Sequence, residues 1–319
     1  MTIKTYLLGF GAALPKKVVT NHDLAQTMDT TDEWIRERTG ITQRHVAGEG
    51  ETATTLATQA AKQALASAKL TAQDIDLIVL ATSTPDLSFP ATATLVQAAL
   101  GVKQGAAFDV QAACSGFIYA LSTAESFIKT GKAKNALVIG VELFSKFVDW
   151  TDRNTAVLFG DGAGAVVLSI SSTGHELLST EIFSNGEFAG ELKATGGVTT
   201  TQTAGNIYMN GREVFKHAVR TMADMLEPAL AKQGLKPADI SWLVPHQANS
   251  RILLATAEHL GLPSDRVVMT VAEQANTSAA SIPLALSHGV NKGFFQKDEI
   301  LVLEAFGAGF TWGNAIVKW

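Results

Sequence analysis

The chain carries one pattern of strand and helix segments twice, and this repeat restricts the folds that it can adopt. Residues 70–83 (LTAQDIDLIVLATS) resemble residues 235–247 (LKPADISWLVPHQ), with shared Leu, Asp and Ile positions 165 residues apart. Three further matches follow in the same order: Leu-Gly at 100–101 and 260–261, apolar runs at 135–141 and 298–305, and 162–168 with 313–319. Four matches in one order indicate an internal duplication. We predict two related halves, 1–172 and 173–319, with a more irregular insertion near 184–210.

Each half alternates apolar runs of strand length with helical segments. The runs at 75–83, 106–112, 135–143 and 164–170 are continuously apolar, which is typical of strands covered on both faces. Between the runs lie segments such as 54–70, whose apolar residues recur on one helical stripe. The alternation predicts an α/β fold. Two packed halves also create a cleft where equivalent helix starts converge.

Composition excludes several function classes. A formal net charge of -5 argues against general nucleic-acid binding, and no apolar stretch approaches the ~20 residues needed to span a bilayer. The apolar start reads as strand and turn rather than as a signal peptide, because Gly9, Gly11 and Pro15 interrupt it. The single cysteine, Cys114, can form neither an internal disulfide nor a cysteine zinc cluster. We therefore expect a cytoplasmic protein with no metal, membrane or nucleic-acid partner.

Cys114 lies where a predicted strand meets a predicted helix. The strand at 106–112 ends in small residues, and 115–131 has the length and spacing of a helix that ends at Gly131. A helix start stabilises a thiolate, and small neighbours admit a substrate carbonyl. Most free cysteines are nevertheless small core hydrophobes. The local sequence leaves both interpretations open.

The second half supplies partners for a nucleophilic cysteine. His246 follows the strand of VPHQAN (244–249), and Asn276 stands at the start of the helix that corresponds to the one after Cys114. A surface histidine and a helix-capping asparagine are the simpler interpretations. Because both residues follow duplicated strand ends, as Cys114 does, we favour a catalytic set. The six other histidines lie in helical or loop surroundings, where the simpler interpretation holds.

Six motifs in one order now identify a family resemblance over essentially the whole chain. They are TTDEWIRERTGI (30–41), AACSGF (112–117), DRNTAVLFGDGAGA (152–165), VPHQAN (244–249), NTSAAS (276–281) and EAFGAGFTWG (304–313). The chain resembles the beta-ketoacyl-[acyl-carrier-protein] synthases III, the condensing enzymes that initiate type II fatty acid synthesis. A Cys–His–Asn set separates it from thiolases, which use a second cysteine, and from elongating synthases, which use two histidines. The resemblance implies a thiolase-like fold of two α/β halves, with central mixed sheets in five layers.

The resemblance also implies a mechanism and no cofactor. Cys114 would attack an acyl-CoA, with acetyl-CoA as the expected primer, and hold the acyl group. Malonyl-acyl carrier protein (malonyl-ACP) would then lose CO2, and its carbanion would attack the acyl-enzyme to give 3-oxoacyl-ACP. His246 and Asn276 would donate hydrogen bonds to the malonyl thioester oxygen. The backbone N–H groups of Cys114 and Ala308 would meet a second oxyanion.

Binding residues follow from the resemblance residue by residue. It assigns coenzyme A (CoA) and tunnel contacts to Trp34, Arg38, Arg153, Gly211, Phe215, Asn249 and Phe306. Docking of an acidic carrier protein requires local positive charge, which Lys216 and Arg251, near Arg212 and Arg220, would supply, although this charge run is also typical of a solvated helix face. The family often has further basic residues where this chain has Glu258-His259. In an implied homodimer, Phe89 would reach the partner's primer pocket, where its bulk favours short primers.

Two other classes compete with a condensing enzyme. GFGAAL (9–14) and GDGAGA (160–165) suggest a nucleotide-binding dehydrogenase, but neither has the third glycine that opens a crossover helix. A non-catalytic binding subunit of the same fold would lack Cys114, His246 or Asn276. All three are present.

Overall fold

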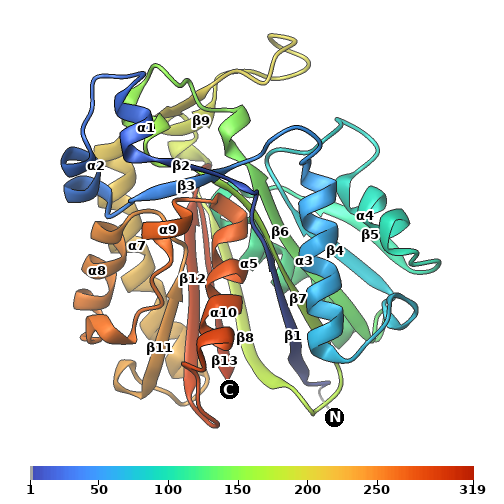
Figure 1. Ribbon diagram of the computed structural model, residues 1–319. Helices are drawn as coiled ribbons and strands as arrows, with labels where there is room; N and C mark the ends of the chain where they lie inside the picture. The colour runs from blue at the N-terminus through green and yellow to red at the C-terminus, as the bar shows by residue number, and fades with distance from the viewer. Residues whose placement is uncertain (1–2) are drawn as a thin grey trace.

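A nine-stranded mixed sheet runs through the structure, a computed structural model that describes residues 3–319 (Figure 1). The strand order is β11-β12-β13-β8-β1-β7-β6-β4-β5. These strands are β1 (Thr5–Ala13), β4 (Leu77–Ala81), β5 (Ala106–Val110), β6 (Asn135–Leu143), β7 (Asp161–Ser169), β8 (His175–Ser184), β11 (Ile240–Pro245), β12 (Ile300–Gly307) and β13 (Thr311–Lys318). Two short sheets pair β2 (Lys17–Thr20) with β3 (Gln43–Val46) and β9 (Leu192–Ala194) with β10 (Ile207–Met209).

The sheet contains the same strand arrangement twice. In the first half β4 is parallel to β6, β6 antiparallel to β7, and β7 antiparallel to β1. In the second half β11, β12, β13 and β8 repeat these neighbours and directions. A parallel bridge between Leu243 and Val267 stands where the first half has β5. This repeat is the topology that an internal duplication predicts, while the boundary at 172–173 stays a prediction.

The two central sheets expected from the resemblance are joined into one. Strand β8 pairs along most of its length with β13 and, near its start, with β1. The two halves are therefore linked by backbone hydrogen bonds as well as by side-chain packing.

The helices complete a layered α/β arrangement. They are α1 (Asn21–Ala25), α2 (Asp32–Thr39), α3 (Ala53–Ala68), α4 (Thr92–Leu100), α5 (Gly116–Lys129), α6 (Arg153–Ala156), α7 (Gly211–Lys232), α8 (Ser250–His259), α9 (Val271–Gln274) and α10 (Ser281–Lys292). Helices α3 and α4 cover the outer face of the first half, and α7 and α8 that of the second (Figure 1). Helices α5 and α10 lie between the two halves of the sheet. This confirms the predicted α/β fold and its five layers.

Close packing explains the glycines of the first strand. A Cβ atom on Gly9 or Gly11 would collide with the backbone of α3, at Ala64 and Ala60 respectively. GFGAAL therefore belongs to a strand, and GDGAGA lies in β7 from its second residue onward. Neither segment opens a helix, so the dinucleotide-binding alternative is wrong.

The fourth apolar run, predicted at 164–170, begins three residues earlier in the structure, at Asp161. The Asp161 carboxylate is buried, where it accepts hydrogen bonds from the backbone N–H of Ala47 (2.7 Å) and of Ser145 (2.8 Å) and from the Ser145 hydroxyl (2.6 Å). Paired in this way, an acidic residue can extend a buried strand. Apolar periodicity could not indicate this, because the partners come from other segments.

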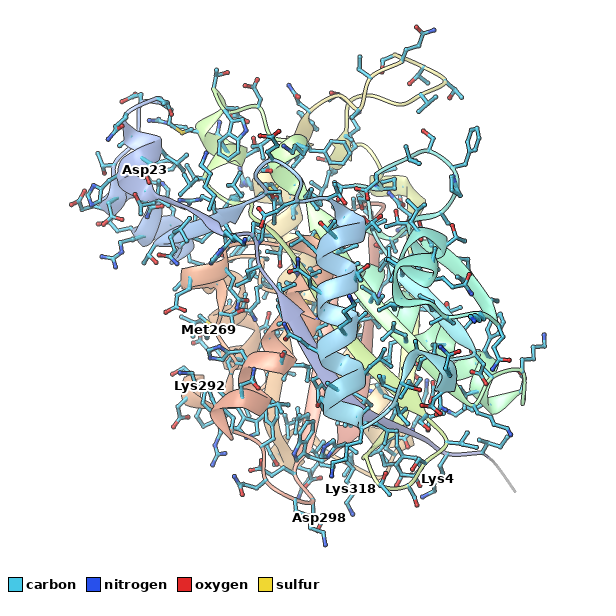
Figure 2. All side chains as sticks on the ribbon, turned by 45° about the vertical axis from the view of Figure 1, so that its right-hand side comes forward. Lys4, Asp23, Met269, Lys292, Asp298 and Lys318 are labelled. Carbon is cyan, nitrogen blue, oxygen red and sulfur yellow. The ribbon has the colours of Figure 1, made fainter. Side chains whose placement is uncertain are left out.

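The first and last described residues lie at the end of the molecule opposite helices α1 and α2. Figure 2 shows Lys4, Asp298 and Lys318 at this end and Asp23, on α1, at the other. The Lys318 ammonium lies 3.0 Å from the Asp298 carboxylate. Within residues 3–319, no helix combines the length and the apolar character needed to cross a bilayer.

Candidate active site

Cys114 occupies a tight elbow between a strand and a helix. Strand β5 ends at Val110, residues Ala113–Ser115 form a 3-10 turn, and α5 begins at Gly116. Ala113 has a φ of 45°, in the left-handed region that non-glycine residues rarely adopt. Ser278, 165 positions later, repeats this conformation with a φ of 48°. The two halves therefore present equivalent elbows, one before Cys114 and one just after Asn276.

One cavity brings together the three residues expected to carry the chemistry. Its volume is about 740 Å³, and Cys114, His246 and Asn276 all line it. Their exposed fractions are 7%, 6% and 6%, so each reaches the cavity from an otherwise buried position. Cys114 precedes α5, His246 follows β11, and Asn276 lies between α9 and α10. The turn before α5, the end of β11 and the loop after α9 thus converge at one cavity.

Burial keeps Cys114 in its thiol form. It raises the pKa of this thiol to about 12, and a hydrogen bond from the Ser278 side chain offsets only part of that effect. The sequence led us to expect a thiolate stabilised by the helix start. That expectation is wrong for the free enzyme, because burial of the sulfur raises its pKa by more than the hydrogen bonds lower it.

His246 is neutral and firmly held. Burial lowers its pKa to about 4, so the imidazole carries no charge at neutral pH. Its backbone N–H donates to the Glu304 carbonyl at 2.8 Å, and its Nδ1 lies 2.7 Å from the Ser281 hydroxyl. Nε2 is therefore the ring atom left for a ligand.

Asn276 is oriented by its own loop. Its side-chain oxygen accepts a hydrogen bond from the Ser278 backbone N–H at 2.9 Å. Its backbone N–H and carbonyl bond to Leu158 and Gly160 at 2.9 and 3.0 Å. With Oδ1 engaged in this way, the Nδ2 hydrogens are the part of the amide available to a substrate oxygen.

The end of β12 approaches the Cys114 turn closely. A Cβ atom on Gly307 would lie 2.9 Å from the Cys114 nitrogen and 3.0 Å from the Ser115 nitrogen, so only glycine fits without a shift. Within the described residues, no backbone carbonyl in a turn or loop accepts from the N–H groups of Cys114 and Ala308. Both residues line the cavity, as Phe306 does. These two donors remain available to a substrate oxygen.

A second cavity of about 540 Å³ has Trp34, Arg38 and Arg251 among its polar and apolar lining residues, and it adjoins the first, with which it shares both arginines. The guanidinium carbons of Arg38 and Arg153 lie 4.4 and 5.0 Å from the centre of the Trp34 ring. Phe215 and Asn249 line the first cavity. Of the residues assigned to CoA contacts by resemblance, all but Arg153 therefore line one of the two cavities, and Arg153 contacts the Trp34 ring.

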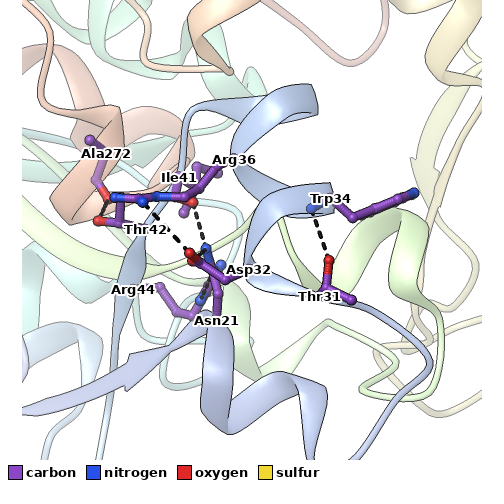
Figure 3. Close-up of polar contacts among 9 residues, drawn as sticks. All are labelled: Asn21, Thr31, Asp32, Trp34, Arg36, Ile41, Thr42, Arg44 and Ala272. Atoms are coloured by element: carbon purple, nitrogen blue, oxygen red, sulfur yellow. Dashed lines mark hydrogen bonds and ion pairs between the residues drawn. The ribbon is translucent and has the colours of Figure 1, made fainter.

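A buried polar network holds the helix that carries Trp34. Asn21 donates to the Asp32 carboxylate at 2.8 Å, and Arg44 donates to the Asn21 side-chain oxygen at 2.9 Å (Figure 3). Arg44 also donates to the Val157 carbonyl at 2.9 Å. Burial lowers the pKa of Arg44 to about 10, so it stays charged at neutral pH. This network connects the first turn of α2 to the body of the protein.

Several cavity walls were not predicted from the sequence. Leu192, Ile207 and Met209 come from β9 and β10, which lie within the insertion near 184–210. Phe144 and Phe147 follow β6. Such residues look like ordinary core positions, and only the fold aims them at the cavity. Ser278 and Ser281 were also missed, although both stand in the NTSAAS motif.

Three expected recognition residues lie outside the catalytic group. Phe89 is 84% exposed and lines neither cavity, so its contact with a partner subunit stays a prediction. Lys216, on α7, lies 4.0 Å from Glu213 on the same helix, which weakens the local positive charge. Arg251, on α8, lies with its guanidinium 5.9 Å from the Phe215 ring and lines both cavities.

The chain matches family models and full-length relatives. The model described as 3-Oxoacyl-[acyl-carrier-protein (ACP)] synthase III matches residues 108–186, and its C-terminal counterpart matches residues 230–319. The Beta-ketoacyl-[acyl-carrier-protein] synthase III of Rhodospirillum centenum is 57% identical over 323 residues, covering 100% of both chains. That of Rhizobium meliloti is 52% identical, covering 99% of this chain and 100% of the relative.

Solved structures agree with these matches. The crystal structure of 3-oxoacyl-[acyl-carrier-protein] synthase III from Aquifex aeolicus VF5 has a TM-score of 0.94 and 49% identity, and covers 99% of this chain and 100% of its own. The priming beta-ketosynthase of the R1128 polyketide pathway has a TM-score of 0.94 at 31% identity, covering 99% of this chain and 97% of its own. With the family models and the full-length relatives, these similarities place this chain in the 3-oxoacyl-[acyl-carrier-protein] synthase III family of acyltransferases.

Proposed function

We propose that this chain condenses an acyl-CoA primer with malonyl-ACP, giving 3-oxoacyl-ACP, CO2 and CoA in the first condensation of type II fatty acid synthesis. One observation carries the proposal: a single cavity holds a nucleophile, Cys114, beside two neutral hydrogen-bond donors, His246 and Asn276. Acetyl-CoA is the expected primer. The reaction needs no cofactor, because the CoA thioester is a substrate.

Acyl transfer uses Cys114 and the two free backbone amides. The sulfur attacks the thioester carbonyl and its proton passes to solvent, while the carbonyl oxygen becomes an oxyanion that the N–H groups of Cys114 and Ala308 can stabilise. The carbon–sulfur bond to CoA then breaks, and CoA leaves as a thiolate that takes a proton from solvent. Because the free Cys114 is a thiol, its deprotonation must accompany substrate binding or attack.

Condensation uses His246 and Asn276. Loss of CO2 from the malonyl group moves an electron pair onto the thioester enolate, whose oxygen carries the developing charge. The imidazole N–H and the amide N–H stabilise that oxygen in a site that excludes water. The enolate carbon then attacks the acyl-Cys114 carbonyl, and the cysteine sulfur leaves and recovers a proton.

The residues around the two cavities support the assignment of CoA and the acyl carrier protein as the groups that carry the substrates. Arg38 and Arg153 beside Trp34 offer guanidinium groups for phosphate and an aromatic face for an adenine. Arg251, which lines both cavities, and the exposed Lys216 on α7 would meet the acidic surface of the carrier protein. We propose further that the enzyme acts in the cytosol as a homodimer, with Phe89 reaching toward the partner subunit.

An acyl adduct on Cys114 is the direct test of the proposed function. Incubation with acetyl-CoA should add one acetyl group per chain, because the chain has a single cysteine. Intact-mass measurement followed by peptide mapping locates the adduct. The proposal fails if Cys114 stays unmodified with acetyl-CoA and with every longer or branched acyl-CoA tested.

The rate of this acylation should rise with pH. A thiol whose pKa is about 12 gains thiolate roughly tenfold per pH unit at lower pH, so the single-turnover rate should climb steeply between about pH 6 and pH 9. Rapid-quench mass spectrometry at fixed acetyl-CoA concentration measures it. A rate that is constant above pH 7 would instead indicate a thiolate in the free enzyme.

Carrier-protein docking should depend on Arg251 and Lys216. Replacement of either by Glu should weaken the reaction with malonyl-ACP by on the order of tenfold, because the carrier protein presents an acidic surface. Lys216→Glu, outside both cavities, should also spare acylation by acetyl-CoA. Lys292→Glu, on α10 and outside both cavities, is the matched control. Equal losses in the two half-reactions would place these residues in the CoA site or in folding.

A further inference from the structure

The His246 ring has a buried partner whose role the proposed mechanism leaves open. Ser281, the first residue of α10, is 1% exposed, and its hydroxyl oxygen lies 2.7 Å from His246 Nδ1. The same oxygen lies 3.2 Å from the backbone nitrogen of Gln247. One hydroxyl thus contacts two consecutive residues of the loop that follows β11.

The direction of these hydrogen bonds follows from counting protons. The Gln247 backbone N–H can only donate, so the Ser281 oxygen accepts from it. The hydroxyl has one proton of its own, and among residues 3–319 the only acceptor it contacts is His246 Nδ1. A proton on Nδ1 would leave the serine proton buried without an acceptor, which disfavours that tautomer.

We propose that Ser281 is a positioning residue that sets the tautomer of His246. By donating to Nδ1, the serine hydroxyl keeps the single imidazole proton on Nε2. The ring then presents an N–H donor to the malonyl thioester oxygen instead of a lone pair, which would repel the developing charge. This inference rests on the proposed function, in which His246 acts as a donor.

The surrounding loop keeps this arrangement in place. The Gln247 side chain donates to the carbonyls of Pro245 and Val268 at 2.8 and 2.9 Å, and accepts from the backbone N–H groups of Thr270 and Val271 at 2.8 and 3.1 Å. All four hydrogen-bonding positions of this buried amide are therefore used. The backbone at 246–247 cannot turn away from Ser281 without breaking them.

The NTSAAS motif thus serves both donors of the condensation step. Asn276 supplies one donor directly, and Ser281, five residues later, controls the other through His246. The intervening turn, Ser278–Ala280, connects the two.

Nitrogen-15 NMR of the histidine-labelled enzyme tests the tautomer directly. We expect the His246 spectrum to show a protonated Nε2 and an unprotonated Nδ1 at pH 7, with the signals assigned by their loss in His246→Asn. A protonated Nδ1 in the wild-type enzyme would overturn the proposal. This measurement needs no substrate, so it decides the tautomer even if malonyl-ACP proves not to be a substrate.

The kinetics of Ser281 variants test whether the tautomer of His246 affects decarboxylation. Ser281→Ala should populate both tautomers and lower CO2 release from malonyl-ACP about tenfold, while Cys114 acylation stays within about twofold, a smaller loss than deletion of an oxyanion donor. Ser281→Thr keeps the hydroxyl and should restore both the spectrum and the rate. Ser287→Ala, a buried serine on the same helix, is the matched control.

The outcomes separate positioning from a structural role. Equal loss of acylation and CO2 release in Ser281→Ala, with the Nε2–H spectrum retained, would mean that Ser281 only supports packing. If Ser281→Ala does not fold, the wild-type spectrum and Ser281→Thr still decide the question. An enzyme with the expected tautomer but no CO2 release in the wild-type form would contradict the proposed function and leave the tautomer assignment intact.

Discussion

Cys114→Ser should lose acyl transfer from acetyl-CoA by at least about 10⁴-fold, the scale on which removal of a nucleophile acts. The chain has no second thiol that could take over. A serine hydroxyl in the same buried turn is harder to deprotonate than the thiol, whose pKa burial already raises to about 12. The substitution changes one atom, so the backbone donors of Cys114 and Ala308 should keep their positions.

The same variant should still release CO2 from malonyl-ACP. His246 and Asn276 are unchanged, and decarboxylation does not need the sulfur to attack. Intact-mass analysis follows the first reaction, and labelled CO2 follows the second. Ser126→Ala, an exposed position on α5, is the control for changes in that helix. Complete loss of CO2 release in Cys114→Ser would show that the cysteine also takes part in decarboxylation.

His246→Ala and Asn276→Ala should give the opposite result. Each removes one donor to the malonyl thioester oxygen, so condensation should fall by roughly 10²-fold or more. Acylation of Cys114 should continue, though more slowly, because the backbone amides of Cys114 and Ala308 stabilise that oxyanion. They cannot replace His246 and Asn276 while they hold the acyl-enzyme carbonyl.

Separate measurements of the half-reactions decide between the two roles of these residues. Single-turnover acylation is followed by mass, and condensation is measured with enzyme that was acylated beforehand. His259→Ala, an exposed histidine on α8, is the matched control for loss of an imidazole. Poor acylation combined with normal condensation would show that His246 and Asn276 act as bases for Cys114, and the division of duties would be wrong.

Much of the fold was predictable because the information is local and appears twice. Apolar runs of strand length predicted β4, β5, β6 and β7, and the run at 135–143 matches β6 in both bounds. The duplication predicted that strand ends of the two halves would be equivalent. Cys114, His246 and Asn276 could therefore be chosen as candidates, and the structure places all three at one cavity.

The ionisation of the site was not predictable from the same patterns. A helix start beside Cys114 indicated a thiolate, but the pKa depends on how completely other segments exclude water from the sulfur. Leu192, Ile207 and Met209, which help to enclose the cavity, lie about 80 to 95 positions away in the chain. A pattern of neighbouring residues cannot show that segments so far apart in the chain meet in space.

The sequence by itself determined the repeated α/β order and the residue types of the candidate site, because strand and helix periodicities and short motifs are properties of consecutive residues. Only the tertiary structure decided that β8 joins the two halves, that Cys114 is a thiol, and that Ser281 faces His246 Nδ1. Desolvation and hydrogen-bond direction depend on groups that folding brings together from distant segments. Ser281 and His246 are 35 positions apart in the chain and 2.7 Å apart in space.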